Sequence, residues 1–483
     1  MRVRIVLRIL GILMMLYSLS MLPPIAVSLY FSDGLYKAYL ITFFTIFLLG
    51  ILFWVPVYRD SQRLRTRDGF VVAMTYWIAL GAVGALPFIL VDQYALSVVD
   101  ALFESISGIT TTGATVFANV ESLPKSIVYY RHQLQWLGGM GIIVLAVAVL
   151  SMLGIGGMQL YRAETPGAVK DQRIKPRIAE TAKSLWYIYG ALTLLCAGGY
   201  WLAGMNLFDA ICHSFSTISI GGFSSYDASI GYFNNPYIEC VGIFFMLVAA
   251  ANFGLHFYAW QHRSIRDYLR DTEFRFFLIF VLANVALCAM LLLIYRTYTN
   301  PIDAIRYAAF DATSIISTTG FRSADFSVWP SSIIMLLMMG SFVGACAAST
   351  GGGMKVVRVM LIVQHAFREV KRLIHPSATF TIKIGAQPVD GRVLDAVWAF
   401  FAAYLFVFVV LFVLVLGSGL DIESSFSAVV ACLNNLGPGV GAVLENYGEL
   451  SVFSKAILCI AMIIGRLEIF TLLVVCSPIF WRS

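Results

Sequence analysis

The sequence is poor in charge. Only 12% of its 483 residues are Asp, Glu, Lys or Arg, against roughly 25% in an ordinary soluble domain. A soluble chain of this length would be expected to form about three domains, but no hydrophilic stretch here is long enough for even one. With 59% hydrophobic and 14% aromatic residues, the composition excludes a soluble protein and indicates helices in contact with lipid.

Cysteine is scarce and scattered along the chain. The eight cysteines include no Cys-x-x-Cys pair, so neither a disulfide framework nor a metal site is indicated, and we expect them to be small packing residues. They are Cys196, Cys212, Cys240, Cys288, Cys346, Cys432, Cys459 and Cys476.

The residue sets that an enzyme needs are also missing. An intramembrane enzyme requires a nucleophile with a base, paired acids or clustered metal ligands. The acids expected at membrane depth, Glu104, Asp311 and Glu468, fall in separate segments without His or Cys at ligand spacing. We therefore expect neither an enzyme nor an organic cofactor. Three histidines in apolar segments are expected to be hydrogen-bonded packing residues: His132, His213 and His256.

The cations that are present gather in a few loops, which argues against nucleic-acid binding despite the net charge of +6. The basic loops are Arg59–Arg67, Arg162–Arg177, Arg263–Arg275 and Lys355–Arg372. Because excess Lys and Arg in short loops marks the cytoplasmic side, we expect these loops and both termini there. The apolar stretch after Met1–Arg4 is too long for a signal peptide and lacks a cleavage site, so it predicts a retained first helix.

Ten apolar segments are long enough to cross a lipid bilayer, which takes about 20 residues. They lie at roughly 5–31, 37–58, 70–92, 126–158, 182–204, 234–262, 274–296, 330–372, 392–417 and 452–480. Four shorter apolar pieces lie between them, and about 10–14 apolar residues suit a re-entrant half-helix rather than a span. These pieces begin near Asp100, Asp209, Tyr307 and Ser424.

Each short piece ends in a small polar run that closes on a glycine. The four runs are Ser107–Gly113, Ser216–Gly222, Ser314–Gly320 and Ala431–Gly437, and we call their last four residues glycine segments 1 to 4. These segments are Thr110, Thr111, Thr112 and Gly113; Ser219, Ile220, Gly221 and Gly222; Ser317, Thr318, Thr319 and Gly320; and Asn434, Asn435, Leu436 and Gly437. A single such run would be an ordinary helix-packing surface. Four copies in equivalent places favour loops around one axis, where a ring of carbonyl oxygens can replace the hydration shell of an ion.

The repeat predicts the organisation of the chain as an all-α polytopic membrane protein. The unit is a helix, a half-helix, a glycine segment and a second helix, and it occurs four times after two extra helices. We assign 1–68 to the two N-terminal helices, and 69–178, 179–272, 273–390 and 391–483 to pore repeats 1 to 4. The register within the copies agrees, because polar side chains stand nine residues before the closing glycine in three of them. The four residues at that position are Glu104, His213, Asp311 and Ala428.

The eighth apolar segment is interrupted by glycines. At 1.5 Å per residue, Gly344 lies about 22 Å inward from Trp329 at the outer interface. Since glycine destabilises a helix by roughly 1 kcal/mol relative to alanine, we expect a mobile constriction that acts as a gate. A kink that permits tight helix packing is the alternative. The residues assigned to this gate are Gly344, Ala347, Ala348, Ser349, Thr350, Gly351, Gly352, Gly353 and, from the last segment, Arg466.

Arg466 is a charge inside the last apolar segment, about 22 Å of helix from Trp481. A cation at this depth should face a water-filled cavity or a partner. Glu468 lies on another face of the same helix and is no obvious partner. Two interpretations of Arg466 stay open. Its side chain either forms an ion pair with another helix or lies beside an ion path or the glycine-rich loop.

Taken together, the motifs resemble the Trk/Ktr/HKT superfamily of potassium transporters and, within it, the bacterial TrkH/TrkG branch. The likeness rests on the four glycine segments, the break Ala348–Gly353 and the run Gly465–Glu468, and it covers essentially the whole chain. In the family, glycine at all four closing positions accompanies potassium selectivity, whereas serine at the first accompanies sodium transport. This sequence has Gly113 there. Segments 2 and 4 depart from the Thr-Thr pattern, so only their glycines and backbone carbonyls carry over.

The resemblance implies potassium uptake across a bacterial inner membrane through a channel-like pore, with K⁺ bound by the four glycine segments. It also implies a homodimer and a cytoplasmic TrkA-like regulatory subunit that binds nucleotides. A transporter that works by rocking would be expected to have inverted repeats, whereas these repeats run in the same sense. Passive conduction and symport with a second ion are both compatible with the sequence.

Overall fold

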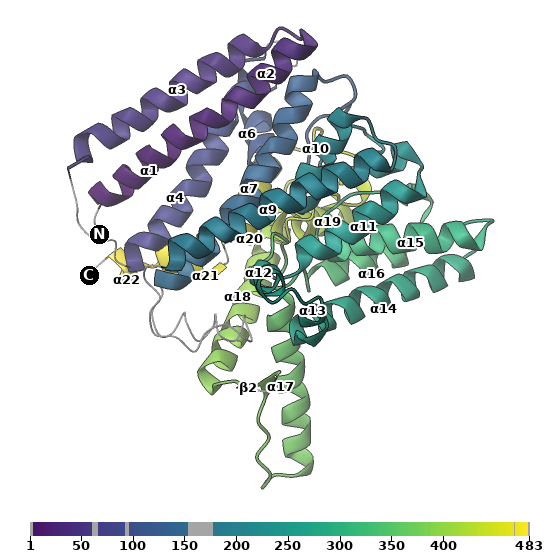
Figure 1. The fold of residues 1–483 in the computed structure, drawn as a ribbon. Coiled ribbons are helices and arrows are strands. Elements are labelled where there is room, and N and C mark those ends of the chain that lie inside the picture. The colour runs from purple at the N-terminus through teal and green to yellow at the C-terminus, as the bar shows by residue number, and fades with distance from the viewer. Residues whose placement is uncertain are drawn as a thin grey trace.

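The computed structural model describes residues 3–59, 66–91, 96–152, 177–385, 387–467 and 469–481. The basic loop Arg162–Arg177 up to residue 176, part of the basic loop Arg59–Arg67, Glu468 and the side chain of Cys476 lie outside the described part. Its regular secondary structure is helical apart from one antiparallel ribbon, β1 (Lys383–Ile384) with β2 (Gln387–Pro388). The predicted all-α polytopic membrane protein is confirmed (Figure 1).

Helices occupy all ten predicted apolar segments. In chain order they are α1 (Val3–Ser18) with α2 (Leu22–Phe31), α3 (Tyr36–Trp54), α4 (Thr66–Gly84) with α5 (Leu86–Ile89), α7 (Lys125–Met152), α9 (Arg177–Leu202), α11 (Pro236–Ala250) with α12 (Phe253–His262), α14 (Thr272–Ile294), α16 (Ser331–Ser341) with α17 (Val356–Ile374), α18 (Gly391–Leu416), and α20 (Val452–Leu467) with α21 (Ile469–Cys476). Two shorter helices, α13 (Arg266–Arg270) and α22 (Pro478–Trp481), complete the set. Six of the described helical stretches are long and apolar enough to cross a membrane, or seven if α11 and α12 count as one span.

One predicted span is broken. Segment 234–262 was expected to be continuous, but α11 and α12 meet at an angle of 96°. Ala251 has an extended backbone, and the side chain of Asn252 accepts a hydrogen bond from Gly254 N at 2.8 Å, which caps a new helix. An Asn that caps its own backbone competes with helix continuation, so the chain turns here although its composition stays apolar.

The four predicted half-helices are present and are capped at their N-termini. They are α6 (Val98–Ile109), α10 (Leu207–Ile218), α15 (Pro301–Ile316) and α19 (Ile422–Leu433). Their N-caps are Ser97, Asn206, Asn300 and Asp421, whose side chains each accept a hydrogen bond from the first turn. Each helix ends at the residue before its glycine segment, so the four segments begin at four helix C-termini.

Each repeat packs as a triad, and the triads pack in a circle. The triads are α4, α6 and α7; α9, α10 and α11; α14, α15 and α16; and α18, α19 and α20. The second helix of each triad contacts the short helix of the next: α7 on α10, α11 on α15 and α16 on α19. The last triad closes on the first, because α20 packs on α6. The residue boundaries assigned to the repeats from sequence stay predictions.

The two extra helices lie outside this circle. α1 packs along α3 and α4, and α2 packs on α7. Gly11 and Gly50 permit the close crossing of α1 and α3, since a Cβ on either would come within 3.0 Å of the other's carbonyl oxygen. Small residues that let backbones approach are the usual means of helix association in lipid.

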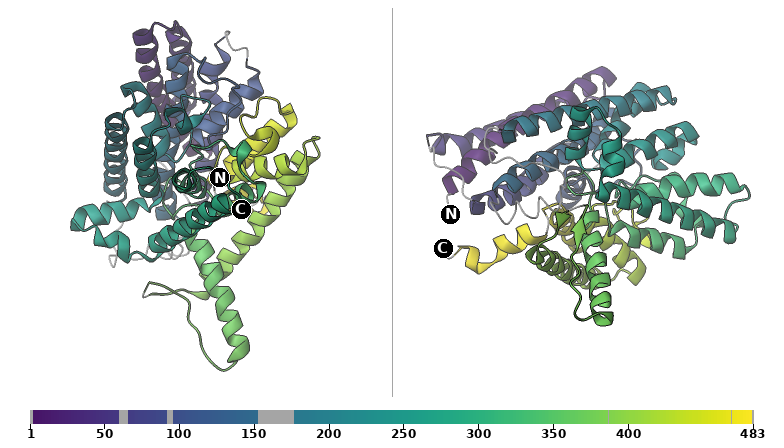
Figure 2. Two further views of the ribbon diagram at one scale, coloured as in Figure 1. Left: turned by 90° about the vertical axis from the view of Figure 1, so that its right-hand side faces the viewer. Right: turned by 60° about the horizontal axis from the view of Figure 1, so that its bottom comes forward.

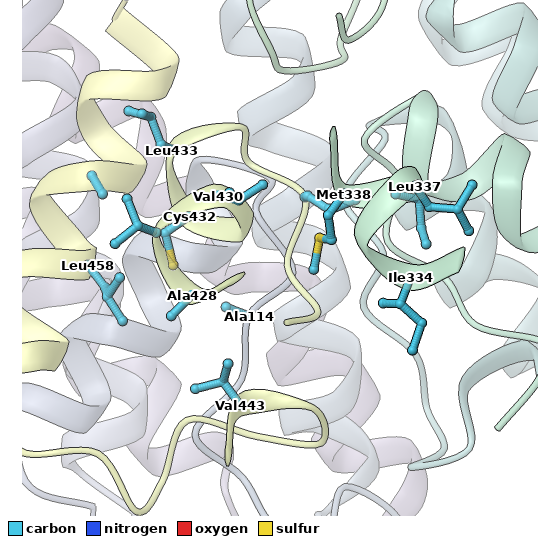
Figure 3. Packing of buried hydrophobic residues seen from close by; sticks show 14 of the residues in the cluster. Ala114, Ile334, Leu337, Met338, Ala428, Val430, Cys432, Leu433, Val443 and Leu458 are labelled. Atoms are coloured by element: carbon cyan, nitrogen blue, oxygen red, sulfur yellow. The ribbon is translucent and has the colours of Figure 1, made fainter. Parts of the chain in front are cut away.

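The main hydrophobic core surrounds the fourth short helix. Figure 3 shows Ala428, Val430, Cys432 and Leu433 of α19 with side chains of α16 and α20 around them. Residues 428–433 are all at most 1% exposed. The C-terminal half of α19 is therefore enclosed on every side, as its apolar composition leads one to expect.

The second half of the interrupted segment leaves the body of the molecule. α17 and the β1–β2 ribbon project together in Figures 1 and 2. Several large apolar side chains of α17 are exposed, among them Phe367 at 64% and Leu373 at 83%. Both ends of the described chain lie on one side of the molecule in Figure 1.

An ion pair joins repeats 2 and 3. Arg306 of α15 donates from Nε and Nη2 to the two carboxylate oxygens of Glu239 on α11, each over 2.7 Å. Glu239 is only 3% exposed. We expect Arg306→Met to destabilise the protein by about 3 kcal/mol, because removing one partner leaves a buried carboxylate unmatched. The melting temperature of the detergent-purified protein measures this.

Two further variants serve as controls for this prediction. The double variant Arg306→Met with Glu239→Gln should recover much of the loss, since both charges are then gone. Arg372→Met, which breaks an exposed pair with Glu369, should leave the melting temperature nearly unchanged. Equal effects of Arg306→Met and Arg372→Met would contradict a structural role for the buried pair.

Candidate functional site

The four short helices end in the same backbone motif. In repeat 1, Thr112 N donates to Ser107 O over 2.8 Å and Thr111 N donates to Gly108 O over 2.9 Å. Bonds equivalent to the first run from Gly221 N to Ser216 O, from Thr319 N to Ser314 O and from Leu436 N to Ala431 O, at 2.7–2.8 Å. This pair of bonds is the Schellman motif, which requires a left-handed residue just past the helix.

That left-handed residue is not a glycine in any of the four copies. Thr111, Ile220, Thr318 and Asn435 have φ values of 52°, 54°, 65° and 53°. Asn visits this region readily, but the three β-branched residues are true outliers. Such strain costs of order 1–3 kcal/mol per residue and persists only where the surroundings impose it, most often at functional sites.

The closing glycines connect the four segments into a ring. Gly113, Gly222, Gly320 and Gly437 all have positive φ, between 77° and 97°. A Cβ on any of them would come closer than 3.0 Å to a carbonyl oxygen of a neighbouring segment. The oxygens that face them belong to Gly221, Thr319, Leu436 and Thr112, in that order. Segment 1 therefore meets segment 2, 2 meets 3, 3 meets 4, and 4 meets 1, and the ring is closed.

Most backbone carbonyls of this ring lack hydrogen-bond partners among the described residues. All residues of the four segments are buried except Gly113 and Gly222, which are half-buried. Among the described residues, only two donate a hydrogen bond to a carbonyl oxygen of the segments: Gln135 to Gly221 and Tyr447 to Gly437. More than nine in ten buried carbonyl groups are ordinarily paired. A buried ring in which most carbonyl oxygens are unpaired is suited to a cation that has lost its water.

A cavity of about 480 Å³ opens on one side of the ring, and all four closing glycines line it. Its charged lining residues are Arg131, Asp227, Arg322, Asp325 and Glu445. Arg131 Nε donates to Glu104 Oε1 over 2.6 Å, so its charge is compensated within the wall. The hydrogen bond from Ser327 N favours the charged carboxylate and holds the pKa of Asp325 below its ordinary value.

The polar residues nine positions before the glycines brace the chain that follows each segment. Glu104 accepts from Val116 N over 3.0 Å and from Thr115 Oγ1. Asp311 accepts from both N and Oγ of Ser323, at 2.8 and 2.9 Å. In repeat 2, Nε2 of His213 shares a hydrogen bond with Ser224 Oγ. In repeat 4 the position is Ala428, and Ser427 Oγ instead accepts from Val440 N over 2.9 Å.

The three histidines expected to be packing residues are hydrogen-bonded in the interior. His213 bonds to Asp209 O as well as to Ser224. His132 bonds to Ser216 Oγ at 2.6 Å. His256 bonds to Tyr268 OH and Val248 O. The expectation that these histidines are packing residues is confirmed by these contacts.

The loop between α16 and α17 lies against the other side of the ring. Thr350 Oγ1 donates to Ile218 O, the last residue of α10, over 3.0 Å. Gly352 N donates to Thr318 Oγ1 over 2.7 Å, and a Cβ on Gly352 would collide with Asn434 O. The loop thus contacts the beginnings of segments 2, 3 and 4, whereas the cavity meets their closing glycines. A further anchor is the bond from Ala347 N to Glu273 Oε1 at 2.7 Å.

Arg466 reaches this loop. Its Nη1 donates to Gly351 O over 3.3 Å, an oxygen that also accepts from Lys355 Nζ. Its Nε and Nη2 have no hydrogen-bond partner in the described part of the chain, and no ion pair of Arg466 is found among the described residues. Of the two interpretations left open by the sequence, the contact with the glycine-rich loop is the one observed.

Two residues that donate hydrogen bonds to carbonyl oxygens of the ring were not predicted from the sequence. Gln135 of α7 donates from Nε2 to Gly221 O over 2.5 Å, and Tyr447 OH donates to Gly437 O over 2.8 Å. Both are buried. Gln135 lies 86 residues from its partner and in another repeat, whereas Tyr447 lies ten residues after its partner. The available signal for Gln135 was the polar run Arg131–Gln135 inside a predicted span, where polar side chains require partners.

Comparison with known proteins identifies the family of this chain. A family model described as TrkH, cation transport protein, matches residues 36–482. The chain belongs to the TrkH family. The resemblance to the Trk superfamily seen in the motifs is therefore confirmed.

Relatives within the TrkH family match over the full length. The Trk system potassium uptake protein TrkH of Vibrio parahaemolyticus is 50% identical over all of both chains. TrkH of Escherichia coli is 48% identical over all of both chains, and TrkG of the same organism is 43% identical over 100% of this chain and 99% of its own. The crystal structure of the potassium transporter TrkH from Vibrio parahaemolyticus matches all of both chains with a TM-score of 0.93 and 48% identity. These relatives are named as transport proteins, in agreement with the expectation that the chain is not an enzyme.

The ring contacts generate a prediction about stability. Gly320→Ala should destabilise the protein by about 1–3 kcal/mol, the usual cost of overpacking, because the new Cβ collides with Leu436 O. Gly198→Ala in α9 is the matched control, since nothing lies within 4 Å of its Cβ position. That change should leave the melting temperature equal or slightly higher, because alanine favours a helix. If Gly320→Ala melts like the control, the ring is looser than described.

Proposed function

We propose that this chain takes up potassium across the bacterial inner membrane through a channel-like pore. The glycine segments would form its selectivity filter, and the cavity beside them its outer entrance. The observation that carries the proposal is the closed ring of buried backbone carbonyls, of which only those of Gly221 and Gly437 accept a hydrogen bond within the described part of the chain. Such oxygens can replace the hydration shell of K⁺, and the relatives of the chain are named as potassium uptake proteins.

The direction of the short helices supports a cation as the ligand. Each of the four runs toward the ring and ends there. A helix C-terminus carries about half a negative elementary charge, so four of them favour a cation at the ring. Inward flow would be driven by the membrane potential, which is worth about 2.3 kcal/mol per charge per 100 mV.

We assign the role of an intramembrane gate to the Gly344–Gly353 loop and Arg466. Support comes from the position of the loop across the ring from the cavity and from its irregular backbone, with positive φ at Gly344, Ala348 and Gly353. An ion that has passed the ring would meet this loop next. Arg466 would hold it through Gly351 O and would add a positive charge to the barrier.

The proposal extends to the assembly. We infer a homodimer that works with a cytoplasmic TrkA-like nucleotide-binding subunit, with both termini in the cytoplasm. The resemblance supports both partners, and the projecting α17 offers exposed apolar side chains of the kind that mark interaction sites. No organic cofactor is part of the proposal.

Rubidium uptake tests the proposal directly. A bacterium deficient in potassium uptake should accumulate rubidium when it expresses this chain, and more so with the regulatory subunit present. Flux that rises with ion concentration without a fixed stoichiometry supports a pore, whereas a constant ratio to a second ion identifies symport. No uptake by protein that is present in the membrane would exclude the proposed function.

Gly113→Ser should weaken the discrimination between potassium and sodium by about tenfold or more. The added side chain would lie against Gly221 O, so the ring would have to open around the ion. Sodium inhibition of rubidium uptake measures the change. Gly34→Ser is a matched control, because Gly34 also has positive φ, 79°, but nothing within 4 Å of its Cβ position. Unchanged selectivity in Gly113→Ser contradicts the filter assignment.

Arg466→Ala should raise cation flux and make it less dependent on the regulatory subunit. A cation about 8 Å from a unit positive charge meets a repulsion of roughly 2 kcal/mol at an effective dielectric constant near 20. Removing it could increase rubidium uptake per molecule on the order of tenfold. Arg296→Ala removes an exposed cation at the end of α14 and should have no such effect. Lower expression of Arg466→Ala with normal uptake per molecule would argue for a purely structural role.

A further inference from the structure

The ring is built from four segments with different side chains at one position. The residue before the closing glycine is Thr112, Gly221, Thr319 and Leu436 in segments 1 to 4. In segments 1 and 3 the threonine hydroxyl pairs with the hydroxyl two residues earlier. Thr110 and Thr112 are 2.8 Å apart through their Oγ1 atoms, and Ser317 Oγ lies 2.7 Å from Thr319 Oγ1.

Segment 2 has the first hydroxyl of this pair but not the second. Ser219 occupies the same place as Ser317, but Gly221, which occupies the place of Thr319, has no hydroxyl with which Ser219 could pair. The φ of Gly221 is not in the left-handed region, unlike that of Gly222. The backbone conformation therefore permits a side chain at position 221. The absence of one must instead reflect a neighbouring group that fills the volume where its Cβ would lie.

The side chain of Gln135 occupies that space. A Cβ on Gly221 would come within 3.0 Å of Cδ, Oε1 and Nε2 of Gln135. Gln135 is fully buried and belongs to α7, the second helix of repeat 1, so it crosses from one repeat to the next. Its amide is bound at both ends, because Nε2 donates to Gly221 O over 2.5 Å and Oε1 accepts from Phe223 N over 3.2 Å.

The contact singles out one oxygen of the ring. Gly221 O is the oxygen that faces Gly113, and the oxygens in the equivalent places belong to Thr112, Thr319 and Leu436. Among the described residues, none donates a hydrogen bond to those three. Only in segment 2 is the ring carbonyl fixed by a side chain from a neighbouring repeat.

We propose that Gln135 is a positioning residue for ion selectivity, which sets the place of the Gly221 carbonyl and substitutes for the missing threonine of segment 2. The inference rests on the proposed function of the ring as a potassium filter. Without the amide, the Gly221 carbonyl is free to approach a smaller ion, and the opening at the contact of segments 1 and 2 is no longer fixed. Discrimination against sodium then falls while the pore remains.

The first test replaces the amide by an apolar side chain of similar length. Gln135→Met should increase the inhibition of rubidium uptake by sodium on the order of tenfold, the size expected for one lost buried hydrogen bond. Gln133→Met is the matched control on the same helix. Gln133 also donates a buried amide bond, but to Ser20 O of the N-terminal helices, over 2.5 Å. The control should keep the selectivity of the unmodified protein.

The second test exchanges the two side chains. Gly221→Thr alone should abolish uptake, because the new side chain collides with Gln135. Combined with Gln135→Ala, the same change should restore selectivity, since the introduced hydroxyl can pair with Ser219 as Thr319 pairs with Ser317. Rescue by a second substitution on a different repeat is not expected of a residue that only fills space.

The outcomes separate the inference from the proposed function on which it rests. If Gly113→Ser changes selectivity but Gln135→Met does not, the role of Gln135 is overturned and the filter stands. If neither changes selectivity, both are overturned. Should Gln135→Met fail to reach the membrane, the double variant decides. Recovery of both protein and selectivity supports the inference, and recovery of protein with poor selectivity overturns it.

Discussion

Closure of a ring by backbone atoms is the constraint on which the rest of this structure depends. Each closing glycine faces a carbonyl oxygen of the next segment at a distance that leaves no room for a Cβ. The ring is irregular backbone among helices that the composition assigns to lipid, and such backbone is tolerated only where protein or a water-filled cavity surrounds it. The four short helices, the cavity and the glycine-rich loop are all arranged around these four contacts.

The ring is stabilised by contacts of several kinds. The Schellman ends of the four short helices impose left-handed conformations on Thr111, Ile220 and Thr318, which those residues would otherwise avoid. Polar side chains from the same helices then hold the chain beyond the glycines. Ion pairs between repeats, such as that of Lys455 on α20 with Asp100 on α6 at 2.6 Å, stabilise the closed circle of triads. The glycine-rich loop completes the enclosure from the side opposite the cavity.

Much of this architecture could be predicted from sequence, because its signals are local. Segment length and apolar composition predicted the spans, and the shorter pieces predicted the short helices. The recurring glycine runs predicted four equivalent positions. The features that could not be predicted depend on a competing local interaction or on a partner far away in the sequence. The 96° bend comes from the Asn252 cap within an apolar stretch, and the contact between Gln135 and Gly221 joins residues 86 positions apart. The brace role of Glu104 and Asp311 also required the fold, since the sequence showed only that those positions are polar.

The ring is assembled from one polypeptide, and this has an evolutionary consequence. A channel of four identical subunits changes all quarters of its filter with every mutation. Here a single substitution alters one of the four segments and leaves the other three intact, so each segment can change separately. The four segments differ in this way: segments 1 and 3 have paired hydroxyls, the side chain of Gln135 from α7 fills the corresponding space beside segment 2, and in segment 4 Asn435 donates to Thr112 Oγ1 over 3.0 Å. The four segments thus share one backbone conformation, whereas their side-chain contacts differ from one segment to the next.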